Sequence, residues 1–248
     1  MNSAGNALVT GGSAGLGLAL CARLRKAGWT VVNCDRAPPQ GSRADWLGVD
    51  LAERAELDAK LPEILARGPY DLVVHNAGLS ATGRFETLPE ELMLRVLRIN
   101  AEAPMVLTSA LEEAGAYAPG ARVVFVSSLS HFIGYPGAAA FAAAKDALAV
   151  YARGIAKRFR RAGKHVLTVF PGPNATAHAE RHAPGAGAGN RTLPEFVADE
   201  ILAALARRHT VLVAGRAAKW AALAGWIAPA LTTLAMRRLL YDRLDREV

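Results

Sequence analysis

The sequence has only two cysteines, Cys21 and Cys34, among its 248 residues. Two thiols cannot build a disulfide framework or a zinc cluster, so we expect a protein of a reducing compartment with no metal site. Residues 1–10 lack the basic start and the long apolar stretch of a signal peptide, which favours a cytoplasmic location. Charged residues are scarce at 21%, against 52% hydrophobic residues. This balance excludes an intrinsically disordered chain and provides for a large buried core.

Acidic residues are few at the C-terminal end, where most of the net charge of +7 lies. Residues 207–248 contain eight Lys or Arg and three Asp or Glu, so these last 42 residues carry a net charge of +5, most of the total of +7. A nucleic-acid-binding surface more often interleaves basic residues with exposed aromatic ones, or carries a known binding motif. Neither is present, and we expect no nucleic-acid partner.

An apolar run at 220–236 (WAALAGWIAPALTTLAM) lies between these basic residues. Its 17 residues are fewer than the about 20 that a membrane-spanning helix needs. Three interpretations are open: a buried or interface helix, a lid over an apolar substrate, or an element lying on a membrane surface. The first two together are favoured, because apolar helical patterns are most often core. We therefore expect residues 216–248 to be a helical extension of the domain formed by residues 1–215, with peripheral membrane contact the less favoured option.

Strand and helix patterns alternate along the rest of the chain. Short apolar and β-branched runs predict strands at 7–10, 30–34, 46–49, 70–75, 122–127, 165–170 and 210–214. Helical apolar spacing predicts helices at 16–28, 53–66, 89–97, 104–114, 138–161 and 194–207. This alternation predicts an α/β fold of the Rossmann type, a doubly wound parallel sheet of about seven strands with helices on both faces.

A glycine-rich turn, Thr10-Gly-Gly-Ser-Ala-Gly-Leu-Gly17, joins the first strand to the first helix. Glycines allow the backbone to turn tightly and to approach a pyrophosphate, and the helix that follows offers free N–H groups. Any tight strand-to-helix turn has a similar composition, but the place of this one at the opening of a βαβ unit favours a dinucleotide. The residues expected to contact the nucleotide here are Gly11, Ser13, Gly15, Leu16 and Gly17.

Two acidic residues at strand ends are candidates for the adenosine side. Asp35 closes the second strand, where a carboxylate can accept both adenosine ribose hydroxyls and would repel a 2′-phosphate. Arg36 follows directly and can pair with such a phosphate, so Asp35 favours NAD while Arg36 leaves NADP open. The alternative for both is a solvated turn. Asp50 and Leu51, after the third strand, are placed to reach the adenine; the alternative for Asp50 is a helix N-cap, and the two roles are compatible.

Taken together, these and other motifs resemble the short-chain dehydrogenase/reductase family over residues 6–214. The turn matches the family's TGxxxGxG, residues 75–78 match its NNAG with His75 in first place, and residues 171–176 match its PGxxxT. The resemblance implies an NAD(P)-dependent oxidoreductase acting on a carbonyl, alcohol, imine or alkene. It also implies cofactor contacts from Asn76, Ala77, Gly78, Lys145, Pro171, Gly172 and Thr176.

The sequence departs from the family at the centre of its active site, the YxxxK motif. Here the stretch reads Phe141-Ala-Ala-Ala-Lys145, and Ser128 lies thirteen residues before Phe141, as the family serine lies before its tyrosine. By resemblance, Ser128 positions the substrate oxygen, Lys145 holds the nicotinamide ribose, and Asn100 supports a water near the lysine. The family tyrosine transfers the proton, but a phenylalanine ring has no proton to transfer.

Several replacements for the phenol are open. Ser128 is correctly placed but a poor acid, and Lys145 can donate through a water if its pKa is lowered. Histidine is a common acid–base group near neutral pH, which makes His131 a further candidate, although a loop histidine facing solvent is the more common case, as it is for His178 and His182. An iminium or activated alkene needs no protein acid. The substitution at Phe141 can also be an engineered one.

The resemblance also predicts a segment that covers the substrate and an oligomeric state. Residues 171–193, rich in Gly, Ala and Pro, correspond to the segment that covers the substrate in the family. Family members commonly pair through the helices at 138–161 and from 104, so a homodimer or homotetramer is expected, with a small and apolar substrate. The alternative to an oxidoreductase is a non-redox protein on the same fold, either a cofactor-binding pseudoenzyme or an isomerase or lyase.

Overall fold

The computed structural model describes residues 4–40, 45–172, 192–238 and 242. In chain order, its elements are β1 (Asn6–Thr10), α1 (Gly15–Lys26), β2 (Thr30–Asp35), β3 (Trp46–Gly48), α2 (Arg54–Ala66), β4 (Tyr70–His75), α3 (Glu90–Leu97), η1 (Arg98–Glu102), α4 (Ala103–Glu113), β5 (Tyr117–Val126), α5 (Ser130–Ile133), η2 (Pro136–Ala138), α6 (Ala139–Arg161), β6 (His165–Pro171), α8 (Pro194–Ala206), β7 (Val211–Ala214), α9 (Arg216–Ile227) and α10 (Pro229–Met236).

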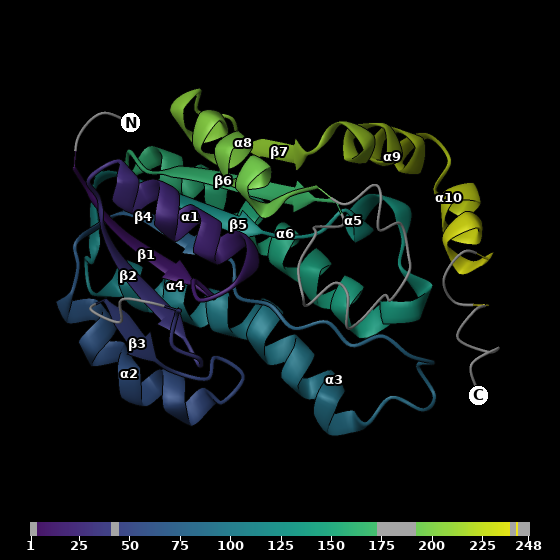
Figure 1. Cartoon of the computed structure of the whole chain (residues 1–248), viewed down its shortest axis with the longest axis horizontal. Coiled ribbons are helices and arrows are strands. Elements are labelled where there is room, and N and C mark those ends of the chain that lie inside the picture. The colour runs from purple at the N-terminus through teal and green to yellow at the C-terminus, as the bar shows by residue number, and fades with distance from the viewer. Residues whose placement is uncertain (1–3, 41–44, 173–191, 239–241, 243–248) are drawn as a thin grey trace.

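Seven strands form one parallel sheet in the order β3-β2-β1-β4-β5-β6-β7 (Figure 1). The chain winds outward from β1 in one direction to β3, then returns beside β1 with β4 and winds the other way to β7. The reversal between β1 and β4 is where ligands bind in such sheets, beyond the carboxyl ends of the strands. The predicted doubly wound fold is therefore confirmed.

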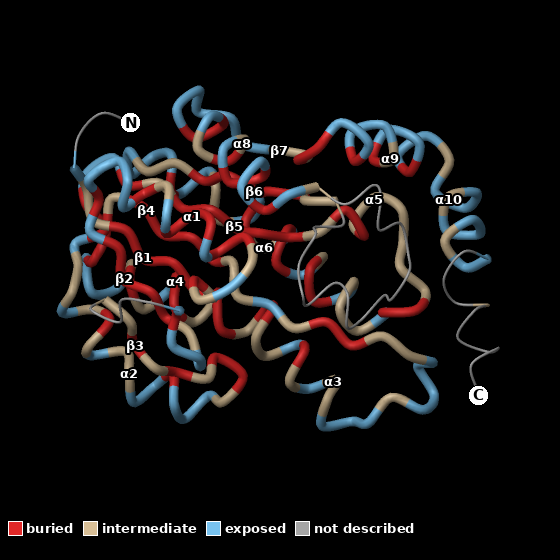
Figure 2. The backbone as a smooth tube through the Cα atoms, in the orientation of Figure 1, coloured by how far each residue is buried: buried red, intermediate tan, exposed pale blue. Residues whose placement is uncertain are grey.

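Helices cover both faces of the sheet, which explains why the strands are apolar without alternation. On one face, α1 and α8 pack on side chains such as Val9, Val31 and Leu167. On the other face, α2, α4 and α6 pack on side chains such as Leu8 and Phe125. Figure 2 shows the strands buried along most of their length and the outer sides of the helices exposed. The sheet thus forms a rigid base for the residues at its carboxyl edge.

The C-terminal apolar run forms two helices, α9 and α10, and is mostly exposed. Burial of this run within the chain, one part of the favoured prediction, is wrong, since Trp220 and Trp226 are 74% and 78% exposed. A single chain does not test the other part, an interface helix. The buried side of α9 consists of small residues, Ala218, Ala222 and Gly225, which lie against α5. Close approach of the two helices leaves no space for large side chains between them, and these project outward instead. The lid interpretation is not tested by this arrangement.

Gly225 is required by this approach, and its replacement offers a direct check of the packing. A Cβ at Gly225 would overlap the carbonyl oxygen of Phe132, whereas a Cβ at Gly154 in α6 meets nothing within 4 Å. Gly225→Ala is expected to lower the free energy of unfolding by about 1–3 kcal/mol through overpacking. Gly154→Ala should raise it by about 1 kcal/mol through helix propensity. Urea unfolding followed by circular dichroism measures both, and shifts of the same sign would contradict the packing described.

Candidate active site

The glycine-rich turn between β1 and α1 has a backbone that only glycine fits at two of its positions. Gly11 has φ of +68° and Gly15 has φ of +51°, both in the left-handed region. A Cβ at Gly17 would overlap the carbonyl oxygen of Gly11, so the first turn of α1 packs directly on the strand end. No side chain caps the N-terminus of α1, which leaves its N–H groups for an anion.

Asn76 fastens this turn to the end of β4. Its side-chain Nδ2 donates hydrogen bonds to the carbonyl oxygens of Thr10 and Gly11, both at 3.1 Å. In return, the hydroxyl oxygen of Thr10 accepts the backbone N–H groups of Asn76 and Ala77, at 3.0 and 3.1 Å. The two central strands are therefore joined at their carboxyl ends, directly beside the turn. The side chain of Leu16, in the first turn of α1, points into the core and is 6% exposed.

Asp35 lies beside the turn at the end of β2. Its carboxylate accepts the backbone N–H of Ser13 at 3.0 Å and that of Ala37 at 3.1 Å. Ser13 is held in turn, because its hydroxyl donates to Ala37 O and accepts from Asn33. These bonds orient the carboxylate and leave acceptor sites on it for a ligand hydroxyl. Arg36 is exposed next to it.

Asp50 has partners on both carboxylate oxygens. One oxygen accepts the backbone N–H of Ala52 at 2.9 Å, and the other pairs with Arg95 at 2.8 Å. Arg95 also pairs with Glu53. Asp50 therefore closes the turn before α2, which is close to the capping role considered from the sequence. Leu51 is buried in the core cluster beside it.

Lys145 projects from α6 toward the carboxyl end of β5. Its ammonium donates to the carbonyl oxygen of Val126 at 2.8 Å, and the residue is only 4% exposed. Burial lowers the pKa of Lys145 to about 8, because desolvation penalises the charged form. The Ser127 hydroxyl donates to the Lys145 carbonyl at 2.8 Å, which fixes this part of α6 to the strand end. Ser128, the next residue, accepts the N–H of Ser130 at 3.2 Å.

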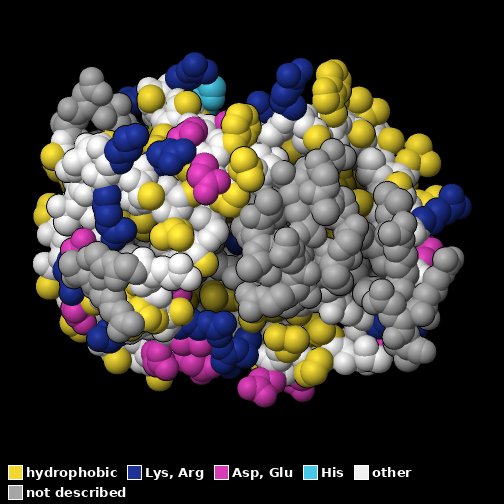
Figure 3. All heavy atoms as spheres, viewed as in Figure 1, with side chains coloured by type: hydrophobic (Ala, Val, Ile, Leu, Met, Phe, Trp, Pro, Cys, Tyr) yellow, Lys and Arg dark blue, Asp and Glu magenta, His cyan; other side chains and the backbone are white. Residues whose placement is uncertain are grey.

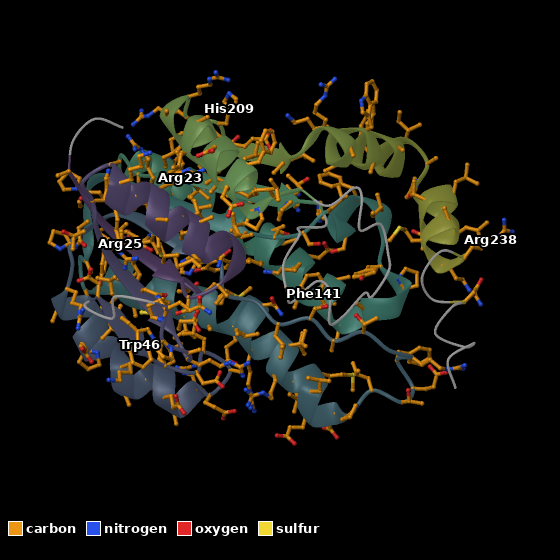
Figure 4. All side chains as sticks on the ribbon, viewed as in Figure 1. Arg23, Arg25, Trp46, Phe141, His209 and Arg238 are labelled. Atoms are coloured by element: carbon orange, nitrogen blue, oxygen red, sulfur yellow. The ribbon has the colours of Figure 1, made fainter. Side chains whose placement is uncertain are left out.

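Phe141 lies in the first turn of α6, one helical turn before Lys145 (Figure 4). The lysine nitrogen is 5.9 Å from the centre of the Phe141 ring. The ring packs with the small cluster around Val96 and Ala144, so it is held in place by its neighbours. The aromatic ring is thus present at this position, but without a hydroxyl.

Asn100 lies in η1, a single π-helical turn between α3 and α4. Its Nδ2 donates to Leu79 O at 2.7 Å and to Val96 O at 2.8 Å. Its Oδ1 is buried without a partner among the described residues. A Cβ placed on Gly78 would lie 2.8 Å from this oxygen and 3.3 Å from Lys145 Nζ, so the three residues share one space. The sequence predicted two separate helices here and missed the π-helical turn that aims Asn100.

His131 is not the solvent-facing loop residue that was the more common expectation. It lies in α5, its side chain is 27% exposed, and its Nδ1 is 2.9 Å from an Asp146 carboxylate oxygen. Its ring stacks on Phe170 with centroids 5.0 Å apart. Asp146 follows Lys145 directly, but no local sequence pattern joins it to His131. Sequence reasoning therefore missed this pair.

His75, the unusual first residue of the NNAG-like motif, is a buried neutral residue. Burial lowers its pKa to about 3, and its Nε2 lies 2.9 Å from the Thr108 hydroxyl. That hydroxyl donates to Pro104 O, so it accepts from the His75 N–H. His75 also stacks on Phe125. It therefore ties β4 to α4 beneath the site.

The remaining predicted residues lie at or beyond the end of β6. Pro171 ends this strand, and its carbonyl oxygen accepts the N–H of Leu129 at 3.0 Å. Gly172 lies close to α9, since a Cβ there would be 3.2 Å from Ala218. Thr176, His178 and His182 lie outside the described residues.

Comparison with known proteins identifies one family and several relatives that are similar to this chain. The sequence model of the family described as short chain dehydrogenase matches residues 5–186. Protein FixR of Bradyrhizobium diazoefficiens is 32% identical over 182 residues, which are 66% of this chain and 65% of FixR. The chain thus spans slightly less than two thirds of that relative's length. A cyclopentanol dehydrogenase of Comamonas sp. is 30% identical over 181 residues, 68% of this chain and 72% of the relative.

Among solved structures, a short chain dehydrogenase from Burkholderia cenocepacia in complex with NADP has the same fold. Its TM-score is 0.77 at 22% identity, with 97% of this chain and 99% of that chain covered. The family match spans most of the sequence, and the sheet, the turn after β1 and the helices around them agree with it. The chain belongs to the short-chain dehydrogenase/reductase family, a family of NAD(P)-dependent oxidoreductases.

Proposed function

We propose that this protein transfers a hydride between NAD(P) and a small, apolar carbonyl or alcohol substrate, or the related imine or alkene, without a tyrosine proton donor. The observation that carries the proposal is Phe141. It stands one helical turn before a buried Lys145, which lies close to Asn100 and binds the end of the strand that Ser128 follows. In this proposal the described residues expected at the nucleotide half are retained, whereas the proton-transfer half lacks its acid.

The residues at the turn after β1 fit a dinucleotide. A Cβ at Gly17 would overlap Gly11 O and one at Gly11 would overlap the backbone of Ala77, so the turn keeps its shape only with glycine there. The Oδ1 of Asn100, close to Gly78, has no partner among the described residues and is free to accept from a ligand or a water. In this proposal the pyrophosphate is held by Gly11, Ser13, Gly15, Leu16 and Gly17. The adenosine ribose is bound by Asp35 and Arg36, and the adenine by Asp50 and Leu51. The nicotinamide half is bound by Asn76, Ala77, Gly78, Lys145, Pro171, Gly172 and Thr176. The bound nucleotide supplies or accepts the hydride. Asp35 favours NAD, and Arg36 keeps NADP open.

The Lys145 ammonium is our candidate for the missing acid. Its pKa of about 8 is close to neutral pH, which suits a group that gives up a proton and recovers it from solvent. One of its three N–H donors is used by Val126 O, and two are left for ligands. In the reductive direction the hydride adds to the carbonyl carbon, the lysine proton passes to the oxygen, directly or through a water, and the Ser128 hydroxyl orients that oxygen.

Apolar side chains near the site support our proposals for the substrate and for the pairing of two copies. Phe132 and Phe170 pack edge to face beside His131, one turn beyond Ser128, which favours an apolar substrate. The Comamonas relative is a cyclopentanol dehydrogenase, which supports a small alicyclic alcohol or ketone as the substrate. Exposed Leu94, Leu97 and Val150 on α3 and α6 support pairing of two copies there. Buried free thiols at Cys21 and Cys34 agree with a cytoplasmic protein.

A second candidate is a non-redox member of the family, either a nucleotide-binding pseudoenzyme or an isomerase or lyase. The observation in its favour is the same Phe141, since a protein that had lost reductase chemistry would keep the ring for packing. The two candidates share nucleotide binding and differ in turnover.

Nucleotide binding is tested at Gly17. Gly17→Ala is expected to weaken NADH binding at least tenfold, because the methyl group displaces the turn from Gly11; tenfold corresponds to about 1.4 kcal/mol. Gly154→Ala, a change of the same size in open space, should leave binding unchanged. Titration followed by nicotinamide fluorescence measures both. Equal affinity of the Gly17 variant would remove this turn from the nucleotide site.

The role of the missing phenol is tested by Phe141→Tyr. If only the hydroxyl is absent, this change should raise ketone reduction by about 10² to 10⁴, the usual contribution of a positioned general acid. Val211→Tyr, at the exposed amino end of β7 and so opposite the carboxyl edge of the sheet, adds a phenol away from the site and should have no effect. Oxidation of NADH or NADPH with a panel of small cyclic ketones is the assay. A parent that turns over a substrate and is slowed by Phe141→Tyr would show that Phe141 serves a different reaction.

The proton route is tested by pH. Reduction consumes a proton, so kcat/KM of the wild-type protein should fall as pH rises through about 8, where Lys145 loses its proton. His131→Asn removes the partner of Asp146 and should leave this fall in place. A profile that is flat from pH 7 to 9 would rule out Lys145 as donor, and loss of the profile in His131→Asn would assign the proton to His131.

A further inference from the structure

The outer sides of α9 and α10 form an apolar surface that no described part of the chain covers. We call it the C-terminal apolar face; its exposed side chains are Trp220, Leu223, Trp226, Ile227, Leu231 and Leu234. The spacing of three, three and one residues in α9 places its four members on one side of the helix. Isolated exposed apolar residues are ordinary, but a contiguous set with two tryptophans marks an interaction surface.

The orientation of this face is fixed by the packing behind it. Ala218, Ala222 and Gly225 press α9 against α5, and the Thr233 hydroxyl of α10 contacts the carbonyl oxygen of Ile133. The close contact at Gly225 leaves no space for the tryptophans to turn inward. The two helices therefore present their large side chains outward as a permanent feature.

Positive charge lies at both ends of the face. Arg216 and Lys219 stand at the start of α9, and Arg237 and Arg238 follow α10. Residues 216–241 contain no Asp or Glu. Lys219 and Arg237 have partners in Glu200 and Asp242, at 3.4 and 3.7 Å. Figure 3 shows hydrophobic side chains along the edge over α9 and α10, with Lys or Arg side chains at its two ends.

We propose that the C-terminal apolar face docks on the surface of a membrane that contains anionic lipids. Tryptophan side chains are suited to the boundary between head groups and acyl chains, and basic flanks are attracted to anionic head groups. Among the described residues no helix is long and apolar enough to cross a bilayer, so the contact is a peripheral one. A second copy of the chain is a poorer occupant, because pairing this face with itself would bring basic residues together without an acidic residue on either helix to oppose them.

This docking has a consequence for the site. Both helices pack on α5, which begins two residues after Ser128. The substrate side of the molecule then lies close to the lipid surface, where apolar substrates concentrate. Membrane binding does not depend on catalysis, so it is tested separately from the proposed activity.

The test uses the full-length protein and vesicles of phosphatidylcholine with or without phosphatidylglycerol. The wild-type protein should co-sediment with the anionic vesicles, with a blue shift of tryptophan emission, because Trp220 and Trp226 leave water while Trp29 is already buried. Trp220→Ser with Trp226→Ser should abolish sedimentation. Phe85→Ser, at a position that is 70% exposed on another part of the surface, should not change it.

The contribution of the basic residues to membrane binding is tested by two double variants, one at the face and one away from it. Arg216→Gln with Arg238→Gln should weaken partitioning about 25-fold, at about fivefold per charge, and Arg160→Gln with Arg161→Gln at the end of α6 should weaken it far less. Failure of the wild-type protein to bind anionic vesicles would overturn the proposal. So would a tryptophan double variant that binds as well as its parent. An oligomer that dissociates in this variant, with no vesicle binding by the parent, would assign the face to a second copy instead.

Discussion

The junction between β1 and β4 is the constraint on which the rest of the site depends. In a doubly wound sheet these two central strands run side by side while their connections diverge, so their carboxyl ends open a crevice. Here Asn76 and Thr10 exchange hydrogen bonds across that crevice and fix the backbone of Gly11. Gly17 can then pack on Gly11 and aim the N-terminus of α1 at the opening. A change in any of these contacts would alter how the helix end lies against the strand end, and with it the nucleotide site that we propose there.

A second junction, between β5 and α6, positions the groups closest to the chemistry. Lys145 Nζ donates a hydrogen bond to Val126 O, and Ser127 Oγ donates one to Lys145 O. The side chain and the carbonyl of Lys145 therefore both join α6 to the end of β5. This arrangement does not involve the group at position 141. Phenylalanine fills the same volume as a tyrosine ring, and loss of the hydroxyl changes the proton chemistry without disturbing the packing. The burial that holds Lys145 also lowers its pKa toward neutral pH, which makes it a candidate acid in place of the phenol.

Much of this was predictable from the sequence, since local patterns report local structure. The apolar β-branched runs placed the strands to within a few residues, except that β5 begins at Tyr117 rather than at 122. The spacing of Ser128, Phe141 and Lys145 placed them on adjoining elements. What the sequence could not provide are contacts between distant segments. The pairing of His131 with Asp146 depends on how α5 lies on α6. The run at 220–236 has the same apolar composition whether its large side chains face the core or the solvent, and only the close packing of Gly225 decides between the two.

If the proposal is correct, the protein binds a nicotinamide nucleotide although the phenol is absent. Calorimetric titration of the wild-type protein with NADH, and separately with NADPH, tests it most directly. We expect about one nucleotide bound per chain with a Kd below about 1 mM for at least one of the two, the range usual for enzyme ligands. No measurable binding of either nucleotide at millimolar concentration would contradict it.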